Sequence, residues 1–266
     1  MSPKWSGRAQ AYAETFAGQC AHSIAPLLDA LAPSAGARLL DVGTGTGVAA
    51  TAALARGCLV TGADPEPDML ALAVEAAPTA TFVQAALPRL PFPDAAFDLV
   101  SANFVVNHVP DPAAATRELH RVLAPGGRLG ASIWPTTPTP IRTLWDDVVA
   151  AAGVPVPNTV TRLAATLDFP RTPAGLAGLL DGAGLVVERA WLQEFVHVVD
   201  PDLWWSGVTR GVANIGQVWL AQAEAGRASL RAAYDELSRP FLQPDGRLHL
   251  PGAAVLAVAR RTAELQ

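Results

Sequence analysis

Residues 39–55 read LLDVGTGTGVAATAALA and hold the most informative motif of the chain. An apolar strand pattern ends at Asp41, three glycines follow at alternate positions (Gly43, Gly45 and Gly47), and an alanine-rich helix pattern begins directly after them. Glycines at such a turn let the backbone approach a ligand closely, and the following helix N-terminus presents free N–H groups. The stretch predicts a ligand-binding turn, with a plain strand-to-helix connection as the alternative.

The spacing of these glycines argues against a nicotinamide dinucleotide as the ligand. The dinucleotide fingerprint needs a third glycine three places after the second, and Val48 stands there. Asp41 lies just before the turn, where a carboxylate gives no help with phosphate. An acid at this position suits a cationic ligand group, such as the amino group of an amino acid.

A second acid follows the next apolar run. Leu59–Ala63 ends at Asp64, about 20 residues beyond Gly43. Acids at this distance bind ribose in nucleotide-binding folds, because a carboxylate accepts hydrogen bonds from both ribose hydroxyls. The alternative is a solvent-facing helix cap. Together the two features predict a ligand with an amino-acid part and a nucleoside part.

Short apolar runs and helical segments alternate along the first half of the chain, which favours a mostly parallel sheet with crossover helices. The predicted strands are Arg38–Val42, Cys58–Ala63, Thr81–Gln84, Phe97–Ala102 and Arg128–Ile133, and the helices between them Val48–Arg56, Met69–Ala77 and Ala113–Leu123. One or two helices are expected over 8–31, and connecting loops from 135 to 173, where proline is dense. The later predictions are a helix at Thr172–Ala183, a strand at Gly184–His197, helices over 200–240 and a strand at Ala253–Ala259.

Four successive motifs resemble those of class I methyltransferases that use S-adenosylmethionine, above all the ubiquinone and menaquinone biosynthesis group. They are LLDVGTGTG (39–47), VTGADPEPDML (60–70), LPFPDAAFDLV (90–100) and NHVPDPAAATRELHRVLAPGGRL (107–129). The resemblance covers residues 36–133, about a third of the chain, and continues more weakly through 172–197 and 246–260. It implies a Rossmann-like α/β fold with a seven-stranded, mostly parallel sheet, an antiparallel last strand and a helical cap.

The resemblance also assigns the cofactor site by position. Asp41 and the three glycines (Gly43, Gly45 and Gly47) would cradle the methionine part of S-adenosylmethionine, and Asp64 would hold the ribose.

Other residues are placed around this cofactor by the same resemblance. Pro65 and Met69 would pack beside the adenine, and Asn103 would lie near the methionyl end. Tyr12, in the N-terminal helical segment, would cover the site and reach the cofactor carboxylate, with a role in the core as the alternative.

One departure from the family concerns the adenine. The family often has an acid after the third strand that receives the adenine amino group, and Ala86 stands at that position. The loss of one hydrogen bond to a neutral group is worth about 0.5–1.5 kcal/mol. We therefore expect weaker binding of the cofactor, with the backbone N–H of Leu87 still offered to the ring.

The methyl acceptor is less clearly marked. A hydroxyl or an acidic carbon needs a base for methyl transfer, and His108 is the best candidate because it follows the fourth predicted strand, on the ligand side of open sheets. A structural histidine is the alternative; His22, His197 and Asp200 are weaker candidates for the base.

Tryptophans mark the segment expected to cap the site. Three of them would form an apolar acceptor pocket or the cap's own core: Trp204, Trp205 and Trp219. We expect methyl transfer to a small, largely apolar metabolite, in secondary metabolism. The alternatives are a non-methylating reaction with the same cofactor, such as a cyclisation, and a binding protein without catalysis.

Composition and charge exclude several function classes. The net charge of −5 and the absence of a Lys/Arg run argue against nucleic acid. Cys20 and Cys58 have no metal-ligand spacing, so no metal is expected. No signal peptide and no apolar run of about 20 residues is visible, so we expect a cytoplasmic protein without a membrane partner. The predicted domains are a helical cap (1–35) and a methyltransferase domain (36–266) with a helical insertion at about 200–240.

Overall fold

The computed structural model describes residues 5–158 and 167–263, which form two compact units. Unit 1 holds the described residues of Met1–Gln19, Thr137–Arg162 and Glu194–Ala253, and unit 2 those of Cys20–Thr136, Leu163–Gln193 and Ala254–Gln266. The predicted domain boundary after residue 35 stays a prediction. In the structure, the chain first passes from unit 1 to unit 2 after Gln19.

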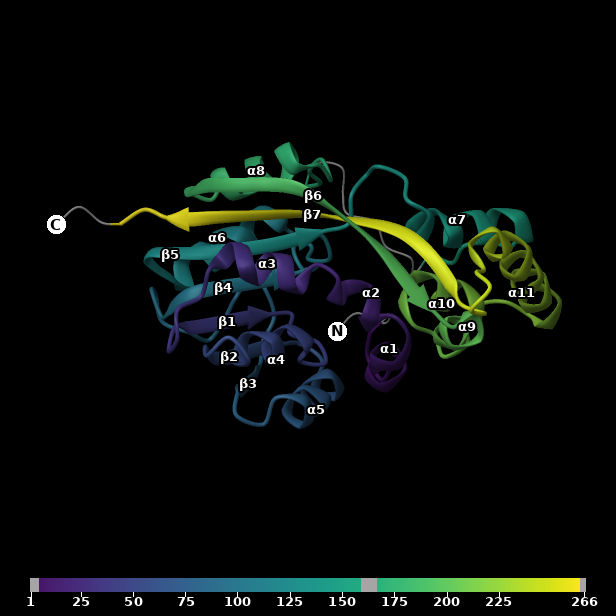
Figure 1. Cartoon of the computed structure of the whole chain (residues 1–266), viewed down its shortest axis with the longest axis horizontal. Coiled ribbons are helices and arrows are strands. Elements are labelled where there is room, and N and C mark those ends of the chain that lie inside the picture. The colour runs from purple at the N-terminus through teal and green to yellow at the C-terminus, as the bar shows by residue number, and fades with distance from the viewer. Residues whose placement is uncertain (1–4, 159–166, 264–266) are drawn as a thin grey trace. The chain divides into compact units, whose positions relative to one another are not determined.

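A seven-stranded sheet has the strand order β3-β2-β1-β4-β5-β7-β6 (Figure 1). Strands β1 to β5 pair in parallel, and β7 pairs antiparallel to β5, as expected for the fold class. The strands are β1 (Arg38–Val42), β2 (Leu59–Asp64), β3 (Thr81–Gln84), β4 (Phe97–Asn103), β5 (Leu123–Ile133), β6 (Leu185–Val199) and β7 (Leu248–Arg261). Both β6 and β7 have residues in each unit, so most of the sheet, but not all of it, belongs to unit 2.

The two faces of the sheet in unit 2 are covered by different helices. Leu129 of β5 belongs to a buried apolar cluster with Leu119 of α6 (Pro112–Val122) and Leu176 of α8 (Pro173–Asp181). Side chains alternate along a strand, so position 130 faces the other side of the sheet. A Cβ at Gly130 would lie 3.1 Å from Leu27 of α3 (Ile24–Leu31), the helix that covers this face. Helices α4 (Val48–Leu54) and α5 (Pro67–Ala76) follow β1 and β2. Strands buried on both faces explain the nearly continuous apolar runs that predicted them.

Unit 1 is mainly helical. Its elements are α1 (Ala9–Thr15), α7 (Pro140–Ala152), α9 (Pro201–Thr209), α10 (Ala213–Leu220), α11 (Glu224–Ser238) and the 3-10 helix η1 (Arg239–Phe241), while α2 (Ala17–Ala21) has residues in both units. Aromatic rings form its core: Trp145 stacks on Tyr234 at 5.3 Å between ring centroids and lies 4.4 Å from Trp204.

Two predictions of local structure were wrong. The segment 135–173, expected to form connecting loops, contains α7. Proline is compatible with this helix because Pro140 lies in its first turn, where the ring fixes a helical φ and a backbone N–H would have no partner within the helix. The segment 8–31 holds three helices rather than one or two. It breaks before α3, where the Ser23 hydroxyl bonds the carbonyl of Cys20 at 2.8 Å, a local bond that competes with the helix.

Candidate functional site

The three glycines form a left-handed turn between β1 and α4, with φ values of 64°, 53° and 84° at Gly43, Gly45 and Gly47. Two of them meet neighbouring elements closely. A Cβ at Gly43 would lie 2.5 Å from a methyl carbon of Val105, and one at Gly47 would lie 2.9 Å from the Cα of Ala73 on α5. These two positions therefore need glycine for packing as well as for conformation.

Gly45 differs from its neighbours because it faces open space. The nearest atom to a Cβ there would be the Gly43 carbonyl oxygen, at 4.0 Å. Its backbone N–H donates to Asp64 Oδ2 at 2.9 Å. The turn is thus tied to the end of β2 and leaves the backbone of Gly45 open to a ligand.

Asp64 is only 7% exposed, and its carboxylate organises the carboxyl edge of the sheet. Besides the bond from Gly45, Oδ1 accepts the N–H of Glu66 at 3.0 Å, just before α5. Burial raises the pKa of Asp64 against the lowering effect of these bonds. A solvent-facing cap is therefore wrong as a description of Asp64. Each carboxylate oxygen has two acceptor sites, so acceptor capacity remains for a further donor.

Asp41 lies deeper, at 1% exposure, on β1. Its two oxygens accept hydroxyl bonds from Thr44 in the glycine turn, at 2.7 Å, and from Ser101 on β4, at 2.6 Å. Burial raises the pKa of Asp41 to about 6, against the lowering effect of the two hydroxyl bonds and with a further increase from the nearby charge of Asp64. Neither Thr44 nor Ser101 is among the site residues predicted from the sequence; an Asp with a Thr three places later in a glycine turn is the available signal for Thr44.

Asn103, at the end of β4, is bonded to its own fold. Its Oδ1 accepts the hydroxyls of Ser23 at 2.6 Å and Ser132 at 2.5 Å, and its Nδ2 donates to the carbonyl of Cys20 at 3.2 Å. Asn103 therefore joins the start of α3 to the carboxyl ends of β4 and β5. Its place near a methionyl group stays a prediction.

The residues assigned to the adenine lie after β2 and β3. Met69 is buried on α5, and Pro65 is exposed, with its carbonyl accepting from Gln84 Nε2 at 3.0 Å. Ala86 is exposed and Leu87 is half-buried against the apolar cluster of unit 2. The four residues thus flank the two strands that follow the glycine turn in the sheet, and their contact with adenine stays a prediction.

His108 is exposed in the segment between β4 and α6, in the same unit as the glycine turn. Its Nε2 lies 3.3 Å from Nδ2 of Asn107. Nearby in the chain, Phe104 at φ 57° stacks on Trp134 with 4.2 Å between ring centroids. This aromatic pair follows β4 and β5 and was missed by the sequence analysis.

The remaining candidates lie in other surroundings. Tyr12 belongs to unit 1 and packs edge-on against Trp5, 5.5 Å between centroids, so its contact with the cofactor stays a prediction. Trp204 and Trp205 are buried in unit 1 at 0% and 6% exposure, as the core alternative expects. Asp200 caps α9 by accepting the N–H of Leu203 at 2.8 Å. His22 is partly buried, which lowers its pKa, and His197 is buried in unit 1.

Comparison with known proteins identifies the family of the chain. A family model described as a methyltransferase domain matches residues 40–131, which run from β1 into β5. The demethylmenaquinone methyltransferase of Streptomyces griseus subsp. griseus is 33% identical over 156 residues, which cover 55% of this chain and 67% of that protein. The chain belongs to the class I methyltransferases.

Other methyltransferases match over shorter stretches. The demethylmenaquinone methyltransferase of Chlorobaculum tepidum is 45% identical over 91 residues, 34% of this chain and 38% of that protein. The chain thus spans well under two thirds of the length of several curated relatives that it matches.

Solved structures share the methyltransferase fold across most of the chain. The YcgJ protein of Bacillus subtilis superposes with a TM-score of 0.58 at 20% identity, over 91% of this chain and 98% of that one. The [4+2]-cyclase SpnF gives a TM-score of 0.54, also at 20% identity, over 93% and 82% of the two chains. At these identities the likeness is one of fold alone.

Proposed function

We propose that this methyltransferase binds S-adenosylmethionine at the carboxyl edge of the sheet in unit 2 and transfers its methyl group to a small, largely apolar metabolite. The observation that carries the proposal is the open backbone at Gly45 beside the buried carboxylate of Asp64, with 2.9 Å between the Gly45 nitrogen and Asp64 Oδ2. A ligand there meets acceptors from two strands, which suits a molecule that carries an ammonium group and a ribose.

The residues present fit this cofactor by their chemistry. Asp41 offers a buried negative charge to an amino group, and Asp64 offers acceptor sites to ribose hydroxyls. When bound, S-adenosylmethionine supplies an electrophilic methyl group on a sulfonium. The chain's own contribution is then to hold the cofactor and to position the acceptor, which accounts for much of the catalysis in such displacements.

The acceptor is proposed from its surroundings and from the relatives. Trp134, half-buried beyond the end of β5 and stacked on the buried Phe104, offers an apolar surface for a flat acceptor. Demethylmenaquinone methyltransferases are named for an apolar acceptor, in line with this proposal. His108, exposed in the same segment as Phe104, is proposed as the base for an acceptor whose nucleophile must lose a proton. We also propose that the protein acts in the cytoplasm and belongs to secondary metabolism.

Two experiments test it in turn. S-adenosylhomocysteine should bind in the micromolar range by calorimetry, and no heat and no thermal shift at millimolar ligand contradicts the cofactor site. The chain should then transfer label from methyl-labelled S-adenosylmethionine to one of a panel of quinols, phenols and amines, detected by mass spectrometry. The His108→Gln variant should lose turnover most strongly for acceptors of high pKa, and full turnover across the pH range would remove His108 from the mechanism.

The main alternative keeps the cofactor but not the methyl transfer. The fold is shared with the [4+2]-cyclase SpnF, so the fold does not decide the reaction. A product that forms only when cofactor is present, yet carries no label, supports a cyclisation. Cofactor binding with neither label transfer nor product supports a binding protein.

A further inference from the structure

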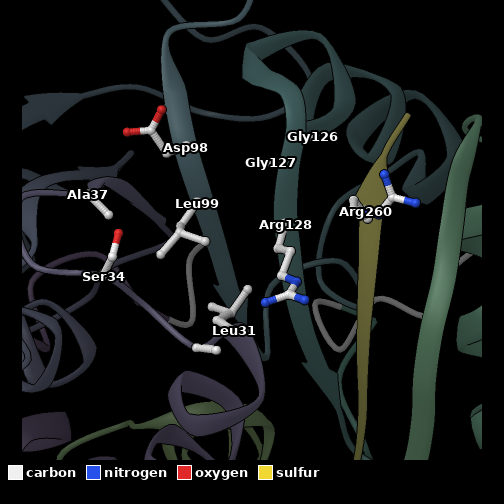
Figure 2. A pocket seen from close by; sticks show the side chains of 10 residues that line it. Leu31, Ser34, Ala37, Asp98, Leu99, Gly126, Gly127, Arg128 and Arg260 are labelled. Atoms are coloured by element: carbon white, nitrogen blue, oxygen red, sulfur yellow. The ribbon is translucent and has the colours of Figure 1, made fainter. Parts of the chain in front are cut away.

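A shallow pocket of about 180 Å³ lies at the other edge of the sheet in unit 2, where β1, β4 and β5 begin (Figure 2). The glycine turn follows the carboxyl end of β1, so this pocket is separate from the proposed cofactor site. Its walls combine apolar side chains, two arginines and a glycine pair: Leu31, Ala32, Ser34, Ala37, Asp98, Leu99, Gly126, Gly127, Arg128 and Arg260.

The strand register explains which side chains line the pocket. Leu99 on β4 is level with Arg128 on β5, and Arg128 is level with Arg260 on β7, so the three side chains leave the same face of the sheet. This is the face of Gly130, which α3 covers through Leu31. Because α3 ends at Leu31, the side chains of Arg128 and Arg260 beyond it stay partly exposed, whereas Leu31 and Leu99 are buried. Figure 2 shows Leu31, Leu99 and Arg128 around this space.

The two arginines share one carboxylate. Arg128 Nε lies 2.9 Å from Glu188 Oε2, and Arg260 Nε lies 3.5 Å from Glu188 Oε1. Like charges directly opposite each other on neighbouring strands are unfavourable, and one carboxylate neutralises only half of this pair. The site therefore keeps a cationic charge toward the pocket.

The acid in the pocket wall does not cancel that charge. Asp98 is held by Arg38, which donates from its backbone N–H at 2.9 Å and from its guanidinium at 3.1 and 2.6 Å. In Figure 2 the Asp98 carboxylate also points away from Leu99 and Arg128. These three arginines and two acids leave one positive charge in excess.

We propose that this pocket binds a small monocarboxylate with a short apolar body, such as an aromatic acid, with its carboxylate on Arg128 and its body over the exposed Ala32 and the accessible edge of Leu99. A planar guanidinium can hydrogen-bond a carboxylate, and the apolar residues in the pocket wall favour a ligand with a ring or short chain over free phosphate. The carbonyl end of α3 borders the pocket and opposes an anion. The side chains of Arg128 and Arg260 are also 37% and 41% exposed, so solvent screens their charges. We therefore expect weak binding, with a Kd of about 1 mM.

Benzoate and its neutral isostere benzamide test this site in the full chain, at constant ionic strength because exposed charges are screened by salt. Benzoate should shift the backbone amide NMR signals of Gly126, Gly127 and Arg128 along a saturating curve, whereas benzamide should leave them in place. Arg128→Gln should weaken benzoate binding at least fivefold. Arg117→Gln is the matched control, because Arg117 is an exposed arginine of α6 in the same unit.

A second variant keeps the test decisive if Arg128→Gln fails to fold. Ser34 is exposed in the pocket wall, so Ser34→Glu adds a tethered carboxylate without removing an arginine, and it should reduce benzoate binding to a similar degree. Equal shifts by benzamide, shifts that never saturate, no shift at 10 mM benzoate, or unchanged binding in both variants would overturn the proposal. Binding of S-adenosylhomocysteine should stay unchanged in Ser34→Glu, so this result is independent of the proposed function.

Discussion

Alanine at Gly45 and at Gly47 should separate ligand binding from folding, although the two residues stand in one turn. Both have positive φ, so a Cβ costs about 1–2 kcal/mol of backbone strain at either site. The loss of glycine's freedom in the unfolded chain returns about 0.4–1 kcal/mol. At the middle of these ranges, strain alone leaves each variant about 0.8 kcal/mol less stable.

Contacts make the difference between the two variants. At Gly47 the new Cβ would lie 2.9 Å from the Cα and 3.1 Å from the Cβ of Ala73, so helix α5 itself must move. Overpacking of this kind costs about 1–3 kcal/mol more. At Gly45 no atom outside the turn lies within 4 Å, so the strain is the whole loss of stability. We expect Gly47→Ala to lose about 2–4 kcal/mol, or about 4–16 °C in Tm, and Gly45→Ala about 2–3 °C.

The two variants should have the opposite order in ligand affinity, with Gly45→Ala losing more affinity than Gly47→Ala. The methyl group of Gly45→Ala enters the open space above the turn and should weaken S-adenosylhomocysteine binding more than tenfold. Calorimetric unfolding and ligand titration on both variants check the pair of results. Parent-like affinity in Gly45→Ala, or equal losses of Tm in the two variants, would refute the assignment of the open backbone to the ligand.

Three further changes probe the acids and the adenine loop. Asp64→Ala should weaken S-adenosylhomocysteine binding at least tenfold, since each bond to a charged acceptor is worth about 1.5–3 kcal/mol; Glu75→Gln, an exposed carboxylate on α5, is the control, and equal affinities by calorimetry would contradict the role. Burial raises the pKa of Asp41 from 3.8 to about 6, so the folded chain binds more protons than the unfolded chain, and this residue's contribution to stability falls as pH rises from about 4 to 7, by up to about 3 kcal/mol. In urea unfolding across that range, Asp41→Asn should gain stability relative to the parent as pH rises, and a constant difference would count against the shift. Ala86→Asp should tighten the cofactor about fivefold through the adenine amino group, with no gain for an analogue lacking that amine, and weaker binding of both would mean that the small side chain is needed for fit.

Local patterns in the sequence predicted the strands and the glycine turn well. Asp41 lies near the end of β1 and Gly43 directly follows that strand, while Asp64 is the last residue of β2. The ends of both strands can therefore be predicted from the residues at those positions. The proline density over 135–173 predicts loops, and for this reason the helix α7 is not predicted from the sequence. Its buried residues Ile141, Leu144 and Val148 follow a helical spacing, and Pro140 stands at the one helical position that favours proline.

The partners of the site residues were beyond the reach of local patterns. Ser101 bonds Asp41 from 60 residues away, and Ser23 bonds Asn103 from 80 residues away. Such contacts depend on which strands are neighbours and on which face each side chain leaves. The resemblance to a family supplied the positions of the acids but not the hydroxyls that hold them in place.

The two buried acids also indicate why the turn is kept in this form. In the part of the chain that the structure describes, neither Asp41 nor Asp64 forms an ion pair, and burial raises the pKa of both. Buried charge without a counter-charge is unfavourable for folding, and the hydroxyl and amide bonds that each acid accepts offset only part of that loss. A ligand that brings an ammonium group and ribose hydroxyls would supply the missing partners. Asp41→Asn should therefore favour folding at neutral pH, because the Thr44 and Ser101 hydroxyls can also accept from an amide, and it should disfavour the ligand. These opposite signs are what a site built for binding rather than for stability requires.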